Sequence, residues 1–167
     1  MSTDVTAGRP TQEISVEING ERITAEVEPR LKVSDFLRNH VDLKSVRVGC
    51  EHGVCGACTI SVDDTLSKSC LMYAVQLDGK EVTTVEGFDR SGSLHPVQEA
   101  FHEEHALQCG FCTSGFMMAA RDLLEKNPDP SRSEIKQALS DNICRCTGYH
   151  NIFDAVEKAA EKMEGEE

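Results

Sequence analysis

The sequence has no tryptophan, and its only aromatic residues besides histidine are two tyrosines and six phenylalanines among 167 residues. A core must therefore be built mainly from aliphatic side chains. No apolar run reaches the roughly 20 residues of a membrane-spanning helix, because Lys, Arg, Asp or Glu interrupts each one. The opening segment MSTDVTAGRPTQE lacks the charged and apolar regions of a secretory signal, which predicts a cytoplasmic protein.

Positive charge is also scarce, since 17 Lys and Arg residues face 29 Asp and Glu residues and the net charge is −12. Nucleic-acid binding requires a basic patch, and the positive residues here are scattered, so we expect no nucleic-acid partner. The sequence has no G-x-G-x-x-G, P-loop or G-x-S-x-G motif. We therefore expect this chain neither to bind a nucleotide nor to attack a substrate itself.

Cysteine, in contrast, is abundant, with eight residues in the chain. In a reducing compartment disulfides are rare, and clustered cysteines more often bind metal. The eight divide into two groups of four along the chain. We call Cys50, Cys55, Cys58 and Cys70 the first quartet, and Cys109, Cys112, Cys144 and Cys146 the second quartet.

The first quartet has the spacing Cys-x4-Cys-x2-Cys-x11-Cys, and its first three members match plant-type [2Fe-2S] ferredoxins. Gly49, Gly53 and Gly56 lie among them and let backbone amides approach the sulfurs. Zinc is an alternative, but zinc ribbons use paired Cys-x2-Cys units, which this run fits poorly. Buried thiols without a metal are a further alternative. The spacing favours a [2Fe-2S] cluster.

The second quartet, Cys-x2-Cys-x31-Cys-x1-Cys, is a weaker signal when taken alone. Two cysteine pairs could hold zinc. A single residue, Arg145, separates the last two cysteines, however, and this spacing is awkward for a tetrahedral zinc knuckle. The spacing therefore favours a second iron–sulfur cluster over zinc.

The first half of the chain has the pattern of a small mixed sheet with one helix. Residues 14–27 alternate apolar and polar side chains around Asn19-Gly20, which predicts a hairpin. Ser34 is expected to cap a short helix that ends near Val41. Residues 59–62 and 81–85 are predicted to be further strands.

The second half has the pattern of four short amphipathic helices, which predicts a compact bundle. The first is expected from Pro96 to about Leu107, and the second from Thr113-Ser114 to Asn127. The third should follow Ser131, with Glu134 completing a capping box. The fourth should carry one apolar stripe, formed by Ile152, Ala155, Val156, Ala159 and Met163. The predicted division is a disordered tail at 1–12, a ferredoxin-type domain at 13–87, a linker at 88–95 and a helical domain at 96–167.

Four motifs carry a resemblance to a known family. They are GCEHGVCGACTI at 49–60, LHPVQEAF at 94–101, QCGFCTSGF at 108–116 and NICRCTGY at 142–149. Their combination and order resemble the small iron–sulfur subunit of the molybdenum hydroxylases, the family of xanthine dehydrogenase, aldehyde oxidase and carbon monoxide dehydrogenase. The resemblance implies an α+β fold, with an N-terminal β-grasp, plant-type ferredoxin-like domain and a C-terminal four-helix bundle, each holding one [2Fe-2S] cluster.

The resemblance also implies partners. A large subunit would hold a molybdopterin-type molybdenum cofactor and a medium subunit would hold FAD, in a heterotrimer or a dimer of heterotrimers. The first quartet would lie nearer the FAD and the second nearer the molybdopterin, where Gln108 would hydrogen-bond the pterin and Cys146 would link cluster and cofactor. We expect the second cluster to be buried and the first to lie nearer an exposed face.

The function that follows is electron transfer. As a non-catalytic subunit, the chain would carry electrons from molybdopterin through both clusters to FAD while the complex hydroxylates a heterocycle or aldehyde with oxygen from water. One alternative is a stand-alone two-cluster ferredoxin, and another is a regulatory iron–sulfur sensor. The sensor is disfavoured because no DNA-reading element is present, and the ferredoxin because a cluster enclosed in a helical bundle fits a fixed partner better.

Overall fold

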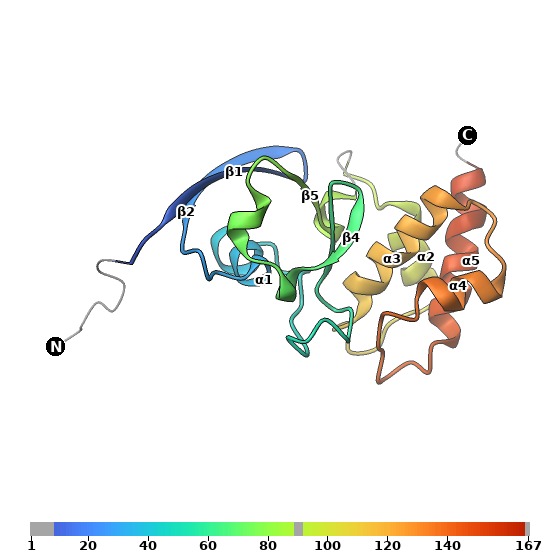
Figure 1. Cartoon of the computed structure of the whole chain (residues 1–167). Coiled ribbons are helices and arrows are strands. Elements are labelled where there is room, and N and C mark those ends of the chain that lie inside the picture. Colours follow the sequence, from blue (N-terminus) through green and yellow to red (C-terminus); the bar gives the residue numbers. More distant parts are fainter. Residues whose placement is uncertain (1–8, 89–91, 166–167) are drawn as a thin grey trace.

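The computed structural model describes residues 9–88 and 92–165. Residues 1–8 of the predicted tail and 89–91 of the predicted linker lie outside the described residues, as do 166–167. Figure 1 shows a curved sheet formed by the N-terminal half and a group of helices formed by the C-terminal half. The predicted α+β class is confirmed by this combination of a mixed sheet and helices.

The N-terminal hairpin forms as predicted. Strands β1 (Gln12–Ile18) and β2 (Glu21–Val27) pair antiparallel, with Ile18 opposite Glu21. Asn19 and Gly20 between them have φ values of 51° and 81°, which is the left-handed backbone that a tight two-residue hairpin turn requires. The hairpin begins two residues earlier than predicted, so part of the predicted tail belongs to the sheet.

The sheet has five strands in the order β2-β1-β5-β3-β4. Strand β5 (Glu81–Thr83) runs parallel to β1 and antiparallel to β3 (Thr59–Val62), which makes the sheet mixed. Strand β4 (Thr65–Lys68), at the edge, was not predicted. Strand β5 ends two residues before the predicted boundary because the 3-10 turn η4 (Val85–Gly87) follows it.

The predicted cap at Ser34 is wrong. Helix α1 (Val33–Asp35) begins two residues earlier than a cap at Ser34 would place it and continues into a π-helical turn, η1 (Phe36–His40). Lys32 occupies the N-cap position without a side-chain hydrogen bond, and Ser34 is buried inside the helix. The start is set by an isolated bridge that pairs Lys32 with Tyr73 and so fixes the incoming backbone.

The first core lies between the sheet and α1. Its buried residues are Ile14, Val16, Ile18, Val27, Val33, Phe36, Leu37, Val46, Cys58, Ile60, Val62, Cys70, Ala74, Leu77 and Val82. Two short 3-10 segments, η2 (Ser69–Leu71) and η3 (Ala74–Leu77), line the same core. Cys58 and Cys70 are thus anchored by the apolar interior that holds the sheet together.

The C-terminal half contains four helices: α2 (Pro96–Glu103), α3 (Thr113–Lys126), α4 (Arg132–Ala138) and α5 (His150–Glu164). All four contribute to one apolar core, which also includes Cys112 and Cys144. Helix α2 ends four residues before the predicted Leu107, where His105 takes a φ of 51°. The predicted capping box at the start of α4 is confirmed.

Within the described part of the chain, no helix combines the length and the apolar character needed to cross a bilayer.

Candidate iron–sulfur sites

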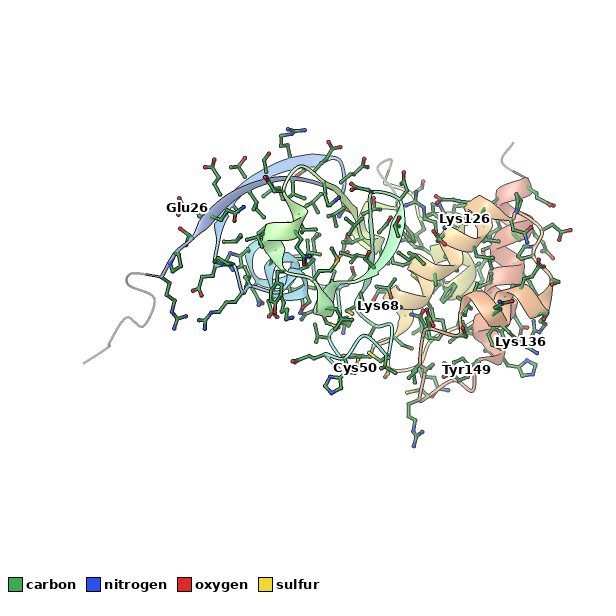
Figure 2. All side chains as sticks on the ribbon, in the orientation of Figure 1. Glu26, Cys50, Lys68, Lys126, Lys136 and Tyr149 are labelled. Carbon is green, nitrogen blue, oxygen red and sulfur yellow. The ribbon has the colours of Figure 1, made fainter. Side chains whose placement is uncertain are left out.

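The first quartet lies in the loop between η1 and β3, with its fourth member on η2. Figure 2 labels Cys50 at the edge of the molecule where this loop approaches the loops of the helical half. The side chains form two contacts: Cys50 with Cys55, and Cys58 with Cys70. Cys50 also acts electrostatically on Cys70, so the two thiol pairs lie within range of each other.

Backbone amides point at the sulfurs of this loop. The N–H groups of Cys55 and His52 donate to the Cys50 sulfur at 3.4 and 3.3 Å, and they lower the pKa of that thiol to about 6. Burial, followed by the contact with Cys58, raises the pKa of Cys70 to about 11. The first quartet therefore offers one thiolate already stabilised at neutral pH, that of Cys50, and one thiol, that of Cys70, whose ionisation a bound cation would favour.

The second quartet comes from the loop between α2 and α3 and from the loop between α4 and α5. It also forms two contacts. The sulfurs of Cys109 and Cys146 are 3.5 Å apart, and Cys112 contacts Cys144. The four predicted residues are again gathered, although 31 residues separate Cys112 from Cys144 in the chain.

Burial and hydrogen bonding act in opposite directions on the inner pair of this quartet. Burial raises the pKa of Cys112 to about 12. Burial also acts to raise the pKa of Cys144, but hydrogen bonds outweigh it and the pKa is lowered; they come from the side chain and amide of Thr147, the amide of Cys146 and the side chain of Cys112. The donors around Cys144 thus favour its thiolate, which is the form that binds a metal.

Both quartets fit the donor set of a [2Fe-2S] cluster, which takes four thiolates, two for each iron. Among the residues described, no three or more His, Cys, Asp or Glu side chains are arranged to hold one metal ion; the thiols gather instead as pairs. The Thr113 hydroxyl, next to Cys112, is the one buried side-chain polar atom in the described residues without a hydrogen-bond partner. An unpaired hydroxyl next to Cys112 fits a site that binds a hydrogen-bond acceptor, such as the sulfide of a cluster.

In this chain alone, the second quartet is the more exposed of the two. Cys109 and Cys146 of the second quartet are exposed, whereas no member of the first quartet is. Three exposed apolar side chains lie within three residues of one or the other in the sequence, namely Leu107, Phe111 and Ile143. The helices cover Cys112 and Cys144 only, so one half of the second site opens to the surface.

The two cysteine loops touch each other directly. The amide of Ile143 donates to the carbonyl oxygen of Cys55 at 2.9 Å. The side-chain amide of Asn142, which is only 3% exposed, donates to the carbonyl oxygen of Gly56 at 3.1 Å. A residue next to Cys144 is therefore hydrogen-bonded to a cysteine of the first quartet.

Small residues make this approach feasible. A side chain on Gly115 would overlap the carbonyl of Gly56, and one on Gly56, whose φ is 74°, would overlap the Asn142 side chain. The Phe111 ring and the Cys55 sulfur would each lie 3.2 Å from a Cβ added at Gly49. The loops pack so closely that their backbones are in contact.

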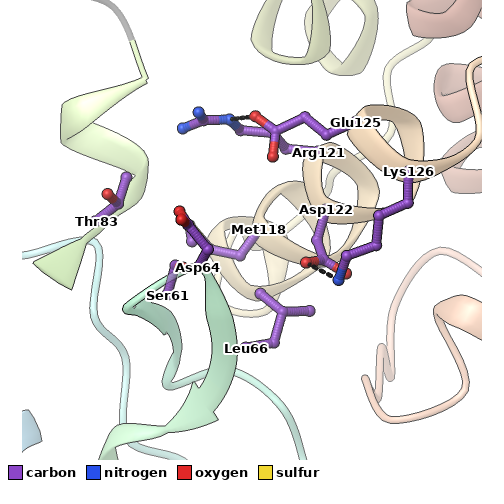
Figure 3. Close-up of a pocket in the computed structure, with 9 residues that line it drawn as sticks. All are labelled: Ser61, Asp64, Leu66, Thr83, Met118, Arg121, Asp122, Glu125 and Lys126. Atoms are coloured by element: carbon purple, nitrogen blue, oxygen red, sulfur yellow. Dashed lines mark hydrogen bonds and ion pairs between the residues drawn. The ribbon is translucent and has the colours of Figure 1, made fainter. Parts of the chain in front are cut away.

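The remaining predicted site residue, Gln108, is exposed and precedes the exposed Cys109. A separate pocket of about 170 Å³ lies between the sheet and α3, and Figure 3 shows its lining. Two ion pairs border it, Arg121 with Glu125 and Lys126 with Asp122. No cysteine lines this pocket, so it lies outside both quartets.

Asn142 and Thr147 were missed as functional candidates by the sequence interpretation. Both lie within the NICRCTGY motif, and their place in that motif was the signal that could have identified them. Gly56, the partner of Asn142, could not be inferred from spacing, because a hydrogen bond between distant loops leaves no local pattern. Thr147 lies only three residues after its partner Cys144, so closeness in the sequence could have indicated this contact.

Comparison with known proteins agrees with this arrangement. Residues 16–84 match the family described as a 2Fe-2S iron-sulfur cluster binding domain, and residues 84–157 match the [2Fe-2S] binding domain family. The fold and the gathered thiols thus define a protein with two [2Fe-2S]-binding domains.

Three relatives identify the family. The small subunit of nicotine 6-hydroxylase from Paenarthrobacter nicotinovorans is 54% identical and covers 86% of this chain and 87% of its own. Caffeine dehydrogenase subunit gamma from Pseudomonas sp. (strain CBB1) is 46% identical, with 90% and 92% covered. The crystal structure of quinoline 2-oxidoreductase from Pseudomonas putida 86 matches at 45% identity with a TM-score of 0.89, covering 93% of this chain and 97% of that one. This chain belongs to the small iron–sulfur subunits of the molybdenum hydroxylases.

Proposed function

We propose that this chain carries electrons from the molybdopterin of a large subunit, through two [2Fe-2S] clusters, to FAD on a medium subunit. The first quartet would hold one cluster and the second quartet the other. Bound clusters of this type supply one-electron storage. The observation that carries the proposal is the direct hydrogen bond between the loops, from the Ile143 amide to the Cys55 carbonyl.

The open side of the second site supports the place of the large subunit. The exposed edge of this site is formed by Cys109 and Cys146, and this chain leaves it uncovered. Three exposed apolar side chains flank the edge, those of Leu107, Phe111 and Ile143. Exposed apolar groups beside a reactive site are typical of a surface that a partner covers. We propose that the large subunit covers this edge and that Gln108 and Cys146 face its pterin.

The first quartet would face the medium subunit. Val54 and Leu71 are among the most exposed large apolar side chains of the described residues, and Leu71 packs against Gly53 of the same cysteine loop. A partner that covers them would bring its cofactor close to this loop. A heterotrimer, or a dimer of heterotrimers, would supply a partner subunit to cover each of the two surfaces.

The domain division at 13–87, 88–95 and 96–167 remains part of this proposal. Two separate apolar cores support it, as do two family matches that meet at residue 84. The contribution of α2, α3, α4 and α5 to one core supports the four-helix bundle, and the mixed sheet packed on α1 supports the β-grasp domain. We propose a cytoplasmic location, where the thiols stay reduced before the clusters are inserted.

The names of three similar proteins support a proposal for the substrate class. Nicotine, caffeine and quinoline, which these names contain, are nitrogen heterocycles. Of the two predicted classes, heterocycles and aldehydes, we therefore propose that the complex hydroxylates a heterocycle, with oxygen from water.

Two matched serine variants test the route. Cys112→Ser should remove the electron paramagnetic resonance signal of the second cluster and stop turnover by the whole complex, while the first signal survives. Cys58→Ser should remove the first signal and leave the second, which also assigns the two signals. Normal turnover in the complex that lacks the second signal would contradict the proposed route.

A further inference from the structure

Cys144 stands in a closed ring of hydrogen bonds. The Thr147 hydroxyl lies 3.1 Å from the Cys144 sulfur, and the amide of Thr147 lies 3.4 Å from the same atom. The amide of Cys144 donates to the Tyr149 phenol oxygen at 3.0 Å, and the amide of Tyr149 donates to the Thr147 hydroxyl oxygen at 3.1 Å. Three residues of one short loop thus fix each other around the sulfur.

The ring determines where the hydroxyl proton points. The Thr147 oxygen accepts from the Tyr149 amide, so its single proton is free to point at the sulfur. A ligand thiolate can only accept, which makes the hydroxyl the donor in this contact. The geometry therefore fixes a charge-assisted hydrogen bond from Thr147 to Cys144.

Tyr149 holds the ring in place. Its φ of 71° is unusual for a bulky residue, and its aromatic ring lies between Phe116 and Phe153, at centroid distances of 6.1 Å from each. These contacts secure the phenol oxygen near the Cys144 amide. The packing of Tyr149 against the helical core therefore fixes the position of the Thr147 hydroxyl.

The first quartet has no matching donor in the described residues. Its recorded sulfur contacts are with backbone amides, such as those of His52 and Cys55 to Cys50, and with other thiols. Thr147 supplies the single side-chain hydroxyl bond to a cysteine sulfur among the hydrogen bonds of the described residues. A change at Thr147 should thus act on one site only.

We propose that Thr147 is a positioning residue that, through Cys144, raises the reduction potential of the second cluster relative to the first. The inference rests on the proposed function, since it takes Cys144 as a cluster ligand. Reduction adds one negative charge to the site, and a donor aimed at a ligand sulfur stabilises the reduced form more than the oxidised form. The hydroxyl of Thr147 would therefore make the second cluster a better electron acceptor than it would be without this donor.

The test compares Thr147→Val, which keeps the branched shape but loses the hydroxyl, with Thr147→Ser, which keeps the hydroxyl. The cluster-loaded full chain is titrated with a reductant while electron paramagnetic resonance follows both signals, which Cys58→Ser and Cys112→Ser assign. Thr147→Val should lower the reduced-to-oxidised ratio of the second cluster at fixed potential by about threefold to tenfold, or about 28–59 mV for one electron. Thr147→Ser should restore the wild-type ratio.

The outcomes distinguish a failure of the role proposed for Thr147 from a failure of the proposed function. An unchanged second potential in Thr147→Val, or an equal shift of both clusters, would overturn the role of Thr147 while leaving the proposed function intact. A wild-type chain with only one cluster signal after full iron loading would contradict the proposed function itself. The line shape of the second signal in Thr147→Val should match the wild type, and a changed line shape would show that the site has rearranged, which contradicts a donor role limited to the potential.

Discussion

Replacing Asn142 should loosen the contact between the two cysteine loops without removing any cysteine. Its buried side chain donates to the carbonyl oxygen of Gly56 at 3.1 Å. That oxygen also accepts from the amide and hydroxyl of Thr59, at 3.1 and 2.7 Å. Losing the Asn142 donor therefore leaves the carbonyl with other partners, which limits the cost of its removal.

The magnitudes follow from this arrangement. Asn142→Ala loses one hydrogen bond and leaves a small void, so we expect a cost of about 1–2 kcal/mol. Asn142→Asp sets a carboxylate oxygen against the Gly56 carbonyl in a buried place, and an uncompensated buried charge costs about 3–5 kcal/mol. For a chain of this size, each 1 kcal/mol lowers the unfolding temperature by about 2–4 °C.

The assay is the apparent unfolding temperature of the cluster-loaded chain at one fixed scan rate. Asn151→Ala is the matched control, because its side-chain amide also donates to a backbone carbonyl, that of Glu104 at 3.0 Å, but on the surface. This control should change stability by less than about 0.5 kcal/mol. If Asn142→Ala were no more destabilising than Asn151→Ala, or Asn142→Asp were as stable as the wild type, the loop contact would not be the constraint described above.

Three further predictions use the same assay. Gly115→Ala should destabilise by about 1–3 kcal/mol, because the new methyl group overlaps a backbone carbonyl of the first cysteine loop, whereas Gly165→Ala at the end of α5 should be neutral. Burial acts to raise the pKa of Glu86, but hydrogen bonds from serine and threonine donors hold that pKa below its usual 4.5. The ionised carboxylate therefore stabilises the fold fully above that pH, and this stabilisation is lost as the pH falls through the lowered pKa. Glu86→Gln should therefore reduce the drop in unfolding temperature between about pH 6 and about pH 4, and an undiminished drop would refute this. Lys162→Met removes surface ion pairs to two glutamates of α2 and should cost less than about 1 kcal/mol, an effect that high salt abolishes.

Local signals in the sequence predicted local structure well. Asn19-Gly20 specifies its hairpin because both residues tolerate a positive φ, and Ser131 with Glu134 specifies the start of α4 through reciprocal hydrogen bonds. Ser34 misled because a serine before an apolar pair is also compatible with a buried position inside a helix. Strand β4 was missed because Leu66 is its single apolar residue, so no alternation of apolar and polar side chains marks it.

The site was predictable in composition but not in assembly. The cysteine spacings and motifs predicted two quartets, and in the structure the members of each quartet form two thiol pairs. The contact of Asn142 with Gly56 and the exposure of Cys146 depend on how distant loops pack, and spacing carries no information about that. The cover expected over the second site is better assigned to a partner than to this chain.

The most direct test of the central claim is the content of iron, molybdenum and flavin per chain after gentle purification from the native source. We expect four irons per chain, two for each cluster, with molybdenum and FAD retained on partner subunits. Four irons with neither molybdenum nor flavin would instead identify a free two-cluster ferredoxin, and zinc in place of iron would contradict both readings.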